Sequence, residues 1–279
     1  MLKTLSFITS HPLTRDRPLA AIARFVRWQI ESRLKEEVEF EWIEGAKLIV
    51  RNGMTGATGN IYCGLHEFAD MAFLLHFLRP GDLFVDVGAN IGSYTVLASA
   101  VCGAETIAIE PDPITMGWLK KNIAANNIAE TVTTVEAAVG REAGEVNFTV
   151  GLDTVNQVAG AGHQNTRKVR VVCLDDLLAG RSPAFIKLDV EGYEAEVIGG
   201  ASETLKNPSL LAIETESRDA EVLSALNSAG FIEHAYDPVQ RMLLRQSGGS
   251  SNALFLKETA SIGDRLSNSK KFRILQSDL

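Results

Sequence analysis

The chain has 279 residues, of which 46% are hydrophobic, so it can bury a full core as one large domain or as one domain with extensions. Its formal net charge of -8 argues against a nucleic-acid binder that relies on neutralising phosphates, although a local basic patch is compatible with it. Cys63, Cys102 and Cys173 are odd in number and lack metal-ligand spacing. This usage favours reduced thiols in a cytoplasmic protein.

Targeting segments are not expected. The first ten residues contain only a short apolar run and no small-residue cleavage site, so we predict no signal peptide. The longest apolar stretch, residues 71–78, contains His76 and is too short to cross a bilayer.

The first 60 residues predict a helical and hairpin extension. Residues 18–35 have a helical period, with Ile22, Val26, Ile30 and Leu34 in one apolar stripe and basic side chains on the other faces. Two interpretations remain: contact with an anionic membrane surface or an acidic partner, or packing against the chain's own domain with a solvated charged face. Nearby glutamates dilute the basic charge and favour the second interpretation.

Residues 38–43 and 47–51 alternate like a β-hairpin, and a glycine-rich loop, either a lid or a plain connection, follows at 51–60. We place a domain at 61–258, which starts with a helix at 65–78, and a polar tail at 259–279.

Residues 83–103 predict the ligand-binding corner of a doubly wound α/β fold. The run 83–87 is typical of a strand buried on both faces of a parallel sheet, and Asp86 interrupts it just before a glycine. Gly88 and Gly92 allow a tight turn and a close approach to a ligand. A mostly apolar helix follows from Ile91 to about Gly103, and this order of elements forms such corners.

S-adenosylmethionine suits this corner best among three cofactors. A nucleoside triphosphate requires Gly-Lys-Ser/Thr, which the chain lacks. A dinucleotide requires Gly-x-Gly-x-x-Gly, but the loop reads Gly-Ala-Asn-Ile-Gly, and Asp86 would face a polyanion. S-adenosylmethionine has no phosphate and carries sulfonium and ammonium cations, which an acidic loop attracts. The next strand, 106–109, ends at Glu110, where a carboxylate can accept both ribose hydroxyls.

The candidate cofactor residues follow from this placement. The methionine side is assigned to Asp86, Gly88, Asn90, Gly92 and Ser93. The ribose is assigned to Glu110, with Asp112 beside it in the same motif. A capping role for Asp86 in its own turn is the alternative.

The third strand, 132–139, has small residues at its end that leave room for a flat ring. Glu136 and Ala137 are therefore the adenine candidates, and a plain buried strand end is equally compatible.

Beyond this strand, 145–150 and 169–173 predict an inserted strand pair. The polar, glycine-rich loop at 151–167 between them is the candidate acceptor-binding loop.

The fourth strand, 184–188, runs into a cluster of carboxylates. Ligands of doubly wound folds bind at the carboxyl ends of such strands, so Asp189 and Glu191 are the candidate catalytic residues. They are placed to remove a proton from an acceptor or to bind a divalent ion, for which the sequence offers no further support. Pairing of Lys187 with one of these acids is the structural alternative.

Three segments together resemble the FkbM family of S-adenosylmethionine-dependent methyltransferases. They are Val-Asp-Val-Gly-Ala-Asn-Ile-Gly at 85–92, Ile-Glu-Pro-Asp at 109–112 and Ile-Lys-Leu-Asp-Val-Glu-Gly-Tyr-Glu at 186–194. The resemblance, from about residue 62 to 216, implies a class I, Rossmann-like fold with a mostly parallel seven-stranded sheet and one antiparallel strand. It also implies methyl transfer to an oxygen, often a sugar hydroxyl. FkbM-like sequences often carry an acidic residue near Glu67, which implies contact with the methionine end; otherwise Glu67 is a first-turn glutamate favoured by the helix dipole.

Other functions remain alternatives. A nicotinamide-dependent oxidoreductase lacks support because the dinucleotide glycines are missing. A non-catalytic module of the same fold would not need the acidic positions at both cofactor strands. A nucleic-acid methyltransferase would carry Asn/Asp-Pro-Pro-Tyr/Phe where 189–192 reads Asp-Val-Glu-Gly. The acceptor, a small molecule or a glycan, and the oligomeric state are not identified by the sequence.

Overall fold

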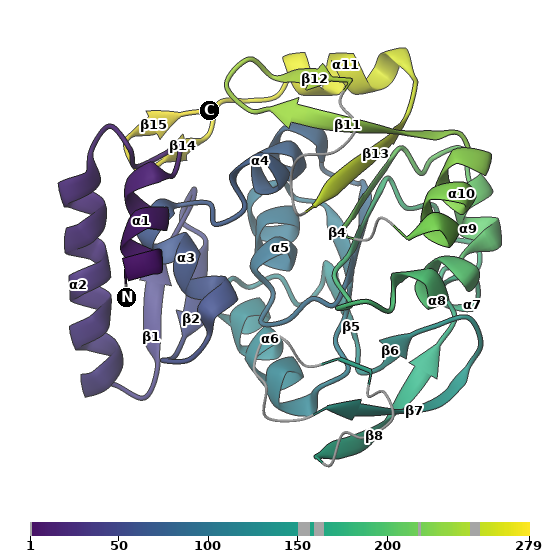
Figure 1. Cartoon of the computed structure of the whole chain (residues 1–279), viewed down its shortest axis with the longest axis horizontal. Helices are drawn as coiled ribbons and strands as arrows, with labels where there is room; N and C mark the ends of the chain where they lie inside the picture. Colours follow the sequence, from purple (N-terminus) through teal and green to yellow (C-terminus); the bar gives the residue numbers. More distant parts are fainter. Residues whose placement is uncertain (1, 150–156, 159–164, 217–218, 246–251) are drawn as a thin grey trace.

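A computed structural model shows a twisted central sheet with helices on both faces (Figure 1). It describes residues 2–149, 157–158, 165–216, 219–245 and 252–279. The central strands, in their order across the sheet, are β12 (Met242–Leu244), β11 (Phe231–Asp237), β13 (Ala253–Lys257), β10 (Ala212–Thr215), β9 (Phe185–Leu188), β3 (Leu83–Val87), β4 (Glu105–Ile109) and β5 (Val132–Val135).

The sheet confirms the class I methyltransferase prediction. Strands β5, β4, β3, β9, β10 and β11 run parallel, and β13 lies antiparallel between β10 and β11. The short β12 is an eighth strand, one more than the seven that the resemblance implies. It arises because the chain turns back after β11 and pairs antiparallel with it.

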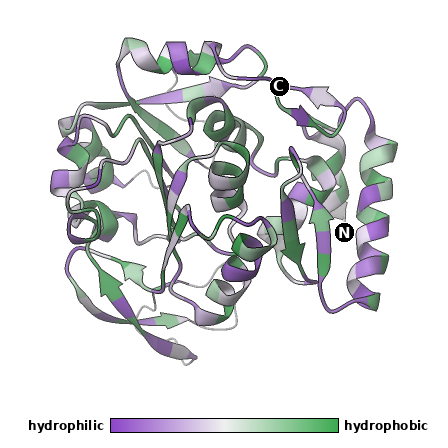
Figure 2. Cartoon of the chain, turned by 180° about the vertical axis from the view of Figure 1, so that it is seen from behind, coloured by the Kyte–Doolittle hydropathy of each residue, from purple (hydrophilic) through white to green (hydrophobic). Residues whose placement is uncertain are grey.

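Two layers of helices cover the sheet. One face carries α4 (Phe68–Phe77), α5 (Ser93–Val96) with its π-helical continuation η1 (Leu97–Val101), α6 (Pro113–Ala125) and α11 (Ala260–Ser267). The other face carries α7 (Leu174–Leu177), α8 (Glu194–Gly199), α9 (Ser202–Lys206) and α10 (Ala220–Ser228). Each face has its own hydrophobic cluster, because side chains alternate between the faces along the buried strands. Figure 2 shows these strands as mostly hydrophobic.

The N-terminal extension packs beside the first of these layers. It consists of α1 (Leu2–Ser10), α2 (Pro18–Leu34), the hairpin β1 (Val38–Glu41) and β2 (Lys47–Val50), and α3 (Thr55–Cys63). Its buried side chains belong to the same hydrophobic cluster as α4, α5 and α6. Both chain ends lie on this side of the molecule (Figure 1). The predicted helix and hairpin are confirmed.

Small β elements complete the chain. A second sheet has the order β6 (Ala138–Val139), β8 (Thr166–Val172) and β7 (Gly144–Thr149), and a terminal ladder pairs β14 (Arg273–Ile274) with β15 (Ser277–Asp278). The prediction of a single strand at 132–139 is therefore wrong. Its first half is the edge strand β5, and its second half leaves the central sheet to pair with β8.

The glycine-rich segment 51–60 is largely helical and not a loop. Helix α3 starts at Thr55 and also crosses the boundary placed at residue 60. Glycine in a helix costs roughly 1 kcal/mol relative to alanine, so composition alone favoured a loop. At Gly59 the reason for glycine is steric, because an added Cβ would lie 2.5 Å from the ring of His66.

Helix α2 has the predicted period but buries a different face. Ala21, Phe25, Trp28 and Ser32 are the buried residues. The predicted stripe faces solvent instead, with Val26 49%, Ile30 55% and Leu34 79% exposed. The larger aromatic surface of Phe25 and Trp28 determines the outcome, and Phe25 packs edge-to-face on Tyr62 with 5.2 Å between the ring centres.

The C-terminal residues form part of the core. Ile262, Leu266, Phe272, Ile274 and Leu279 are all buried in the cluster shared with α4. An ion pair between Arg265 and Asp82 also fixes α11 beside the start of β3.

We expect Leu266→Ala to lower the free energy of unfolding by about 2–5 kcal/mol, because it opens a cavity in a fully buried contact. Urea denaturation followed by circular dichroism measures the change. The exposed Lys271→Ala is the control. Equal stabilities of the two variants would contradict an integral role for the tail.

Candidate active site

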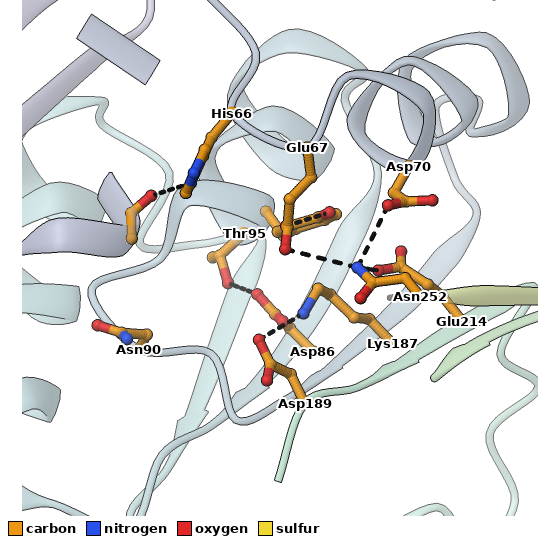
Figure 3. Close-up of polar contacts among 12 residues, drawn as sticks. His66, Glu67, Asp70, Asp86, Asn90, Thr95, Lys187, Asp189, Glu214 and Asn252 are labelled. Atoms are coloured by element: carbon orange, nitrogen blue, oxygen red, sulfur yellow. Dashed lines mark hydrogen bonds and ion pairs between the residues drawn. The ribbon is translucent and has the colours of Figure 1, made fainter. Parts of the chain in front are cut away.

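A buried carboxylate, Asp86, lies near the end of strand β3. Asp86 is 1% exposed, and one of its oxygens accepts a hydrogen bond from the hydroxyl of Thr95 in α5 at 2.7 Å (Figure 3). Burial raises its pKa to about 6, although the positive charge of Lys187 opposes the shift. The carboxylate is anchored to the helix that follows it and lines a cavity, as described below.

The glycines of the first loop allow close contacts within the chain. Gly88 has a φ of 80°, and an added Cβ would lie 1.9 Å from the backbone oxygen of Asp189. At Gly92 an added Cβ would meet the side chain of Leu119 in α6 at 2.5 Å. The loops after β3 and β9 therefore touch at Gly88, which brings the candidate cofactor and catalytic residues together.

Glu110 connects the loops after β3 and β4. One carboxylate oxygen accepts from the backbone amide of Asn90 at 3.0 Å, and the other accepts from the amide of Asp112 at 2.9 Å. Burial raises the pKa of Glu110 to about 7, and these two hydrogen bonds oppose the shift. Each oxygen keeps a second lone pair, so the carboxylate can also accept from a ligand's hydroxyls.

Two cavities meet at the carboxyl ends of these strands. The apolar cavity is lined mainly by Ile109, Glu110, Pro111, Ala137, Ala138, Val139, Phe148, Val158, Val190 and Tyr193. The acidic cavity is lined mainly by His66, Glu67, Asp86, Ser93, Tyr94, Lys187 and Glu216. Gly88, Asn90, Asp189 and Glu191 line both. A ligand can therefore extend from apolar walls into an acidic end.

Lys187 supplies the positive charge of the acidic cavity. Its ammonium group is 2.8 Å from an oxygen of Asp189 and lies over the ring of Tyr94, 4.6 Å from the ring centre. Burial alone would lower the pKa of Lys187, but the carboxylates around it, Asp189 and Glu214 above all, raise it above its usual range. The predicted alternative, an ion pair between Lys187 and a following acid, is present at Asp189.

A second group of carboxylates lies deeper beside this lysine. The amide nitrogen of Asn252 donates to Glu214 at 3.0 Å and to Asp70 at 3.2 Å, and it lies 3.5 Å from Glu67 (Figure 3). The hydroxyl of Tyr94 donates to Glu67 at 2.7 Å. Burial and the charge of Glu67 raise the pKa of Asp70 to about 7, and burial raises that of Glu214 well above its usual range. Burial therefore favours the protonated forms of Asp70 and Glu214.

His66 lies at the outer edge of the acidic cavity. Its Nδ1 is 2.9 Å from the backbone oxygen of Gly56. Because a carbonyl oxygen only accepts, Nδ1 donates, and Nε2 is left with a lone pair in the neutral ring. Its own backbone amide donates to the side chain of Asn60 at 2.8 Å, so α3 fixes the residue in place.

The structure brings most of the predicted residues to these cavities. Glu67, Asp86 and Ser93 line the acidic cavity, Glu110 and Ala137 line the apolar one, and Gly88, Asn90, Asp189 and Glu191 line both.

The other three predicted residues lie elsewhere. Gly92 lines neither cavity. Asp112 caps α6 by accepting from the amide of Ile114 at 2.8 Å. Glu136 is exposed and lines neither cavity. Most of the predicted acceptor loop at 151–167 lies outside the described residues.

Sequence reasoning missed Asp70, Tyr94, Glu214, Asn252 and the position of His66. One signal was available, because Glu214 stands at the end of the strand after Asp189's strand, where carboxylates of a ligand site gather. Asn252 gave no signal, since it reaches the site only because β13 inserts beside β10.

Comparison with known families identifies the domain. Residues 86–233, more than half of the chain, match the Methyltransferase FkbM domain. The chain belongs to the FkbM methyltransferase family. The match covers the β3 corner, the Glu110 loop and the strand end at Asp189.

Two curated relatives are similar over part of their length. The hexuronic acid methyltransferase AglP of Haloferax volcanii is 26% identical over 144 residues, which cover 50% of this chain and 59% of AglP. The 31-O-demethyl-FK506 methyltransferase FkbM of Streptomyces tacrolimicus is 29% identical over 209 residues, covering 59% of this chain and 78% of the relative. The chain thus spans about three fifths of the length of AglP.

Among solved structures, methyltransferase FkbM from Methylobacillus flagellatus KT aligns with a TM-score of 0.43 and 17% identity, over 85% of this chain and 60% of that one.

Within the part of the chain that is described, no helix is long and apolar enough to cross a membrane. The same residues contain no group of three or more His, Cys, Asp or Glu side chains arranged to hold a metal ion.

The raised pKa of Glu110 predicts a pH dependence of stability. A carboxyl whose folded pKa is raised stabilises the fold below its unfolded pKa, near 4.5, and this contribution is lost as the pH rises through about 7. We expect the wild type to lose up to about 3 kcal/mol of unfolding free energy from this group over that range. Glu110→Gln should remove that part of the loss, as measured by urea denaturation at about pH 5 and about pH 8.

The exposed Glu105→Gln is the matched control, because its carboxylate pairs with Arg181 at the surface. A Glu110→Gln variant with the same pH dependence as the wild type would show that this carboxyl does not titrate in the fold.

Proposed function

We propose that this protein transfers the methyl group of S-adenosylmethionine to a hydroxyl of a sugar or natural product. The observation that carries the proposal is the pair of joined cavities at the ends of β3, β4 and β9. The apolar one suits a nucleoside and the acidic one suits a cation. Family membership supports the reaction class.

The residues present fit this cofactor. The carboxylate of Glu110 has free lone pairs for the ribose hydroxyls, and the small side chains of Ala137 and Ala138 leave room for a flat base. Asp86 and Glu67 supply negative charge for the methionine end. When bound, the cofactor supplies a methyl group already activated by a sulfonium.

The protein's own residues then have two tasks. The first is to hold the acceptor oxygen in line with the methyl group in a dry site, which contributes up to about 7–11 kcal/mol. The second is to take the hydroxyl proton as the new bond forms. Asp189 lines both cavities, and its pairing with Lys187 keeps its carboxylate fixed. We assign proton removal to Asp189, with Glu191 beside it at the mouth.

The acceptor class follows from the relatives. One relative is named for a hexuronic acid and the other for a demethylated oxygen of a natural product. The second name supports a hydroxyl acceptor on a small molecule, and the first supports a sugar acceptor, which offers both hydroxyl and carboxylate oxygens. The nicotinamide-dependent alternative has no support from the loop at Gly88, which lacks the dinucleotide glycines.

Helix α2 supports a second proposal, contact with an anionic membrane surface. Its solvent face carries Leu19, Val26, Ile30 and Leu34, and α2 lies at the outer edge of the molecule (Figure 1). Residues 15–37 contain six basic and four acidic side chains, a net +2 in a chain of net -8. An exposed apolar stripe flanked by arginines suits the boundary of an anionic bilayer, where each basic residue contributes about 1 kcal/mol.

Calorimetric titration with S-adenosylmethionine and S-adenosylhomocysteine tests the main proposal, and we expect both to bind. Asp189→Asn should keep cofactor binding but lose at least about a hundredfold in turnover, because it removes the proton acceptor. Turnover is measured as radiolabelled methyl groups transferred to acceptor extracts. Glu105→Gln, at an exposed carboxylate that lines neither cavity, is the control.

Failure to bind either cofactor form would overturn the methyltransferase proposal. Full turnover by Asp189→Asn would leave the reaction in place but remove this residue from its assigned role.

Vesicle sedimentation tests the membrane proposal. We expect binding to vesicles of phosphatidylserine and phosphatidylcholine but not to phosphatidylcholine alone, because the attraction needs surface charge. Ile30→Glu should weaken binding at least about tenfold by placing a charge in the apolar stripe. Met242→Glu replaces an equally exposed apolar residue on β12 and is the control. Equal binding of both variants would refute the proposal.

A further inference from the structure

A cleft within the N-terminal extension adjoins the methyl-transfer site. It lies between α1, α2 and α3 and has a volume of about 610 Å³, within the range of small-molecule sites. Gly56 and His66 line both this cleft and the acidic cavity. These two residues form a wall that both cavities share, so a molecule bound in the cleft lies beside the acidic cavity.

The walls of the cleft are aromatic. Phe7 comes from α1, Phe25 and Trp28 come from α2, and Tyr62 comes from α3. Trp28 is 3% exposed, so only a small part of its ring faces the cleft. Aromatic faces bind apolar C–H surfaces, and the indole nitrogen is a donor for a ligand's oxygen.

A few uncharged polar groups complete the cleft. The hydroxyl of Tyr62 is hydrogen-bonded to the side chains of Thr58 and Gln29, and Asn52 lies at the exposed rim. Such a small set of fixed polar groups on aromatic walls is typical of sites that orient a ligand with hydroxyls.

The charge of the cleft differs from that of the cavity it joins. Apart from His66, no side chain that lines it is ionisable near neutral pH, whereas the acidic cavity contains Glu67, Asp86 and Lys187. The guanidinium group of the neighbouring Arg24 already binds the backbone oxygen of Tyr62, to which its Nε and Nη2 donate at 3.0 and 2.7 Å. A carboxylate in the cleft would lack a cation and would be costly to bury.

We propose that this cleft is the acceptor subsite and that it binds an uncharged sugar ring. A pyranose has an apolar C–H face for Phe7 and the exposed part of Trp28, and hydroxyls at its edge for Tyr62 and Gln29. The ring then presents one hydroxyl to the acidic cavity beside His66. The inference rests on the proposed function and narrows it, since it separates this chain from a methyltransferase that takes a hexuronic acid.

The glycines of α3 are explained by the same subsite. Gly59 holds the His66 ring against the helix, and Gly56 accepts from its Nδ1. Glycines at these positions lower the stability of the helix but allow the His66 ring to lie close against α3 in the wall that both cavities share.

Saturation-transfer NMR on the whole protein tests the proposal without turnover. The probes are methyl β-D-glucopyranoside, methyl β-D-galactopyranoside and methyl β-D-glucuronide. We expect at least one neutral glycoside to bind and the uronide to bind more weakly. Trp28→Phe and Tyr62→Phe should each weaken binding of the neutral glycoside about three- to tenfold. Trp118→Phe, outside the cleft on α6, should leave it unchanged.

Circular dichroism checks that each variant is folded, and calorimetry with S-adenosylmethionine is run on the same samples. Loss of cofactor binding in the wild type overturns the proposed function, whereas the glycoside titrations still report on the cleft. Preference for the uronide, binding of no glycoside, or equal effects of Trp28→Phe and Trp118→Phe would overturn the inference.

Discussion

The site depends on one buried positive charge. Lys187 lies on the central strand β9 and is 3% exposed, yet it faces the carboxylates of Asp86 and Asp189 and the deeper acids Glu67 and Glu214. Without it, these like charges would repel one another in a region of low dielectric. The ammonium group therefore allows an acidic cavity to form at the end of a sheet that is otherwise apolar.

The acidic character of that cavity also explains how the chain distinguishes its cofactor. Positive groups of a ligand add to the partial neutralisation that Lys187 begins, whereas phosphates would be repelled by Asp86 and its neighbours. Glu110 adds a further carboxylate along the same edge of the sheet. Hydrogen bonds from two backbone amides keep it in place, and its remaining lone pairs can accept from a ligand in the apolar cavity.

The corner from Leu83 to Glu110 was predictable because its signals are local. A buried strand, a glycine turn and an acid at the next strand end are each visible in a few consecutive residues. Glu136, an adenine candidate, does not line the apolar cavity. The chain bends there to move from β5 to β6, and the side chain is exposed to solvent. The aliphatic stripe of α2 predicts the wrong buried face. Phe25 and Trp28, on another face of the helix, have the larger apolar surface and are buried instead.

Residues joined by long-range topology were beyond sequence reasoning. Asn252 meets Asp70 only through the insertion of β13, and His66 meets Gly56 only because a glycine-rich segment folds as α3. Helix propensity argued against α3, and tertiary packing overrode it.

The position of β13 has a consequence for biosynthesis. This strand, at residues 253–257, lies between β10 and β11 and is synthesised after both of them. A nascent chain that ends before it has a gap in the middle of its sheet and exposes the edges of two strands. The central sheet therefore cannot close until β13 has left the ribosome, and until then those edges are open to chaperones or to pairing with other chains.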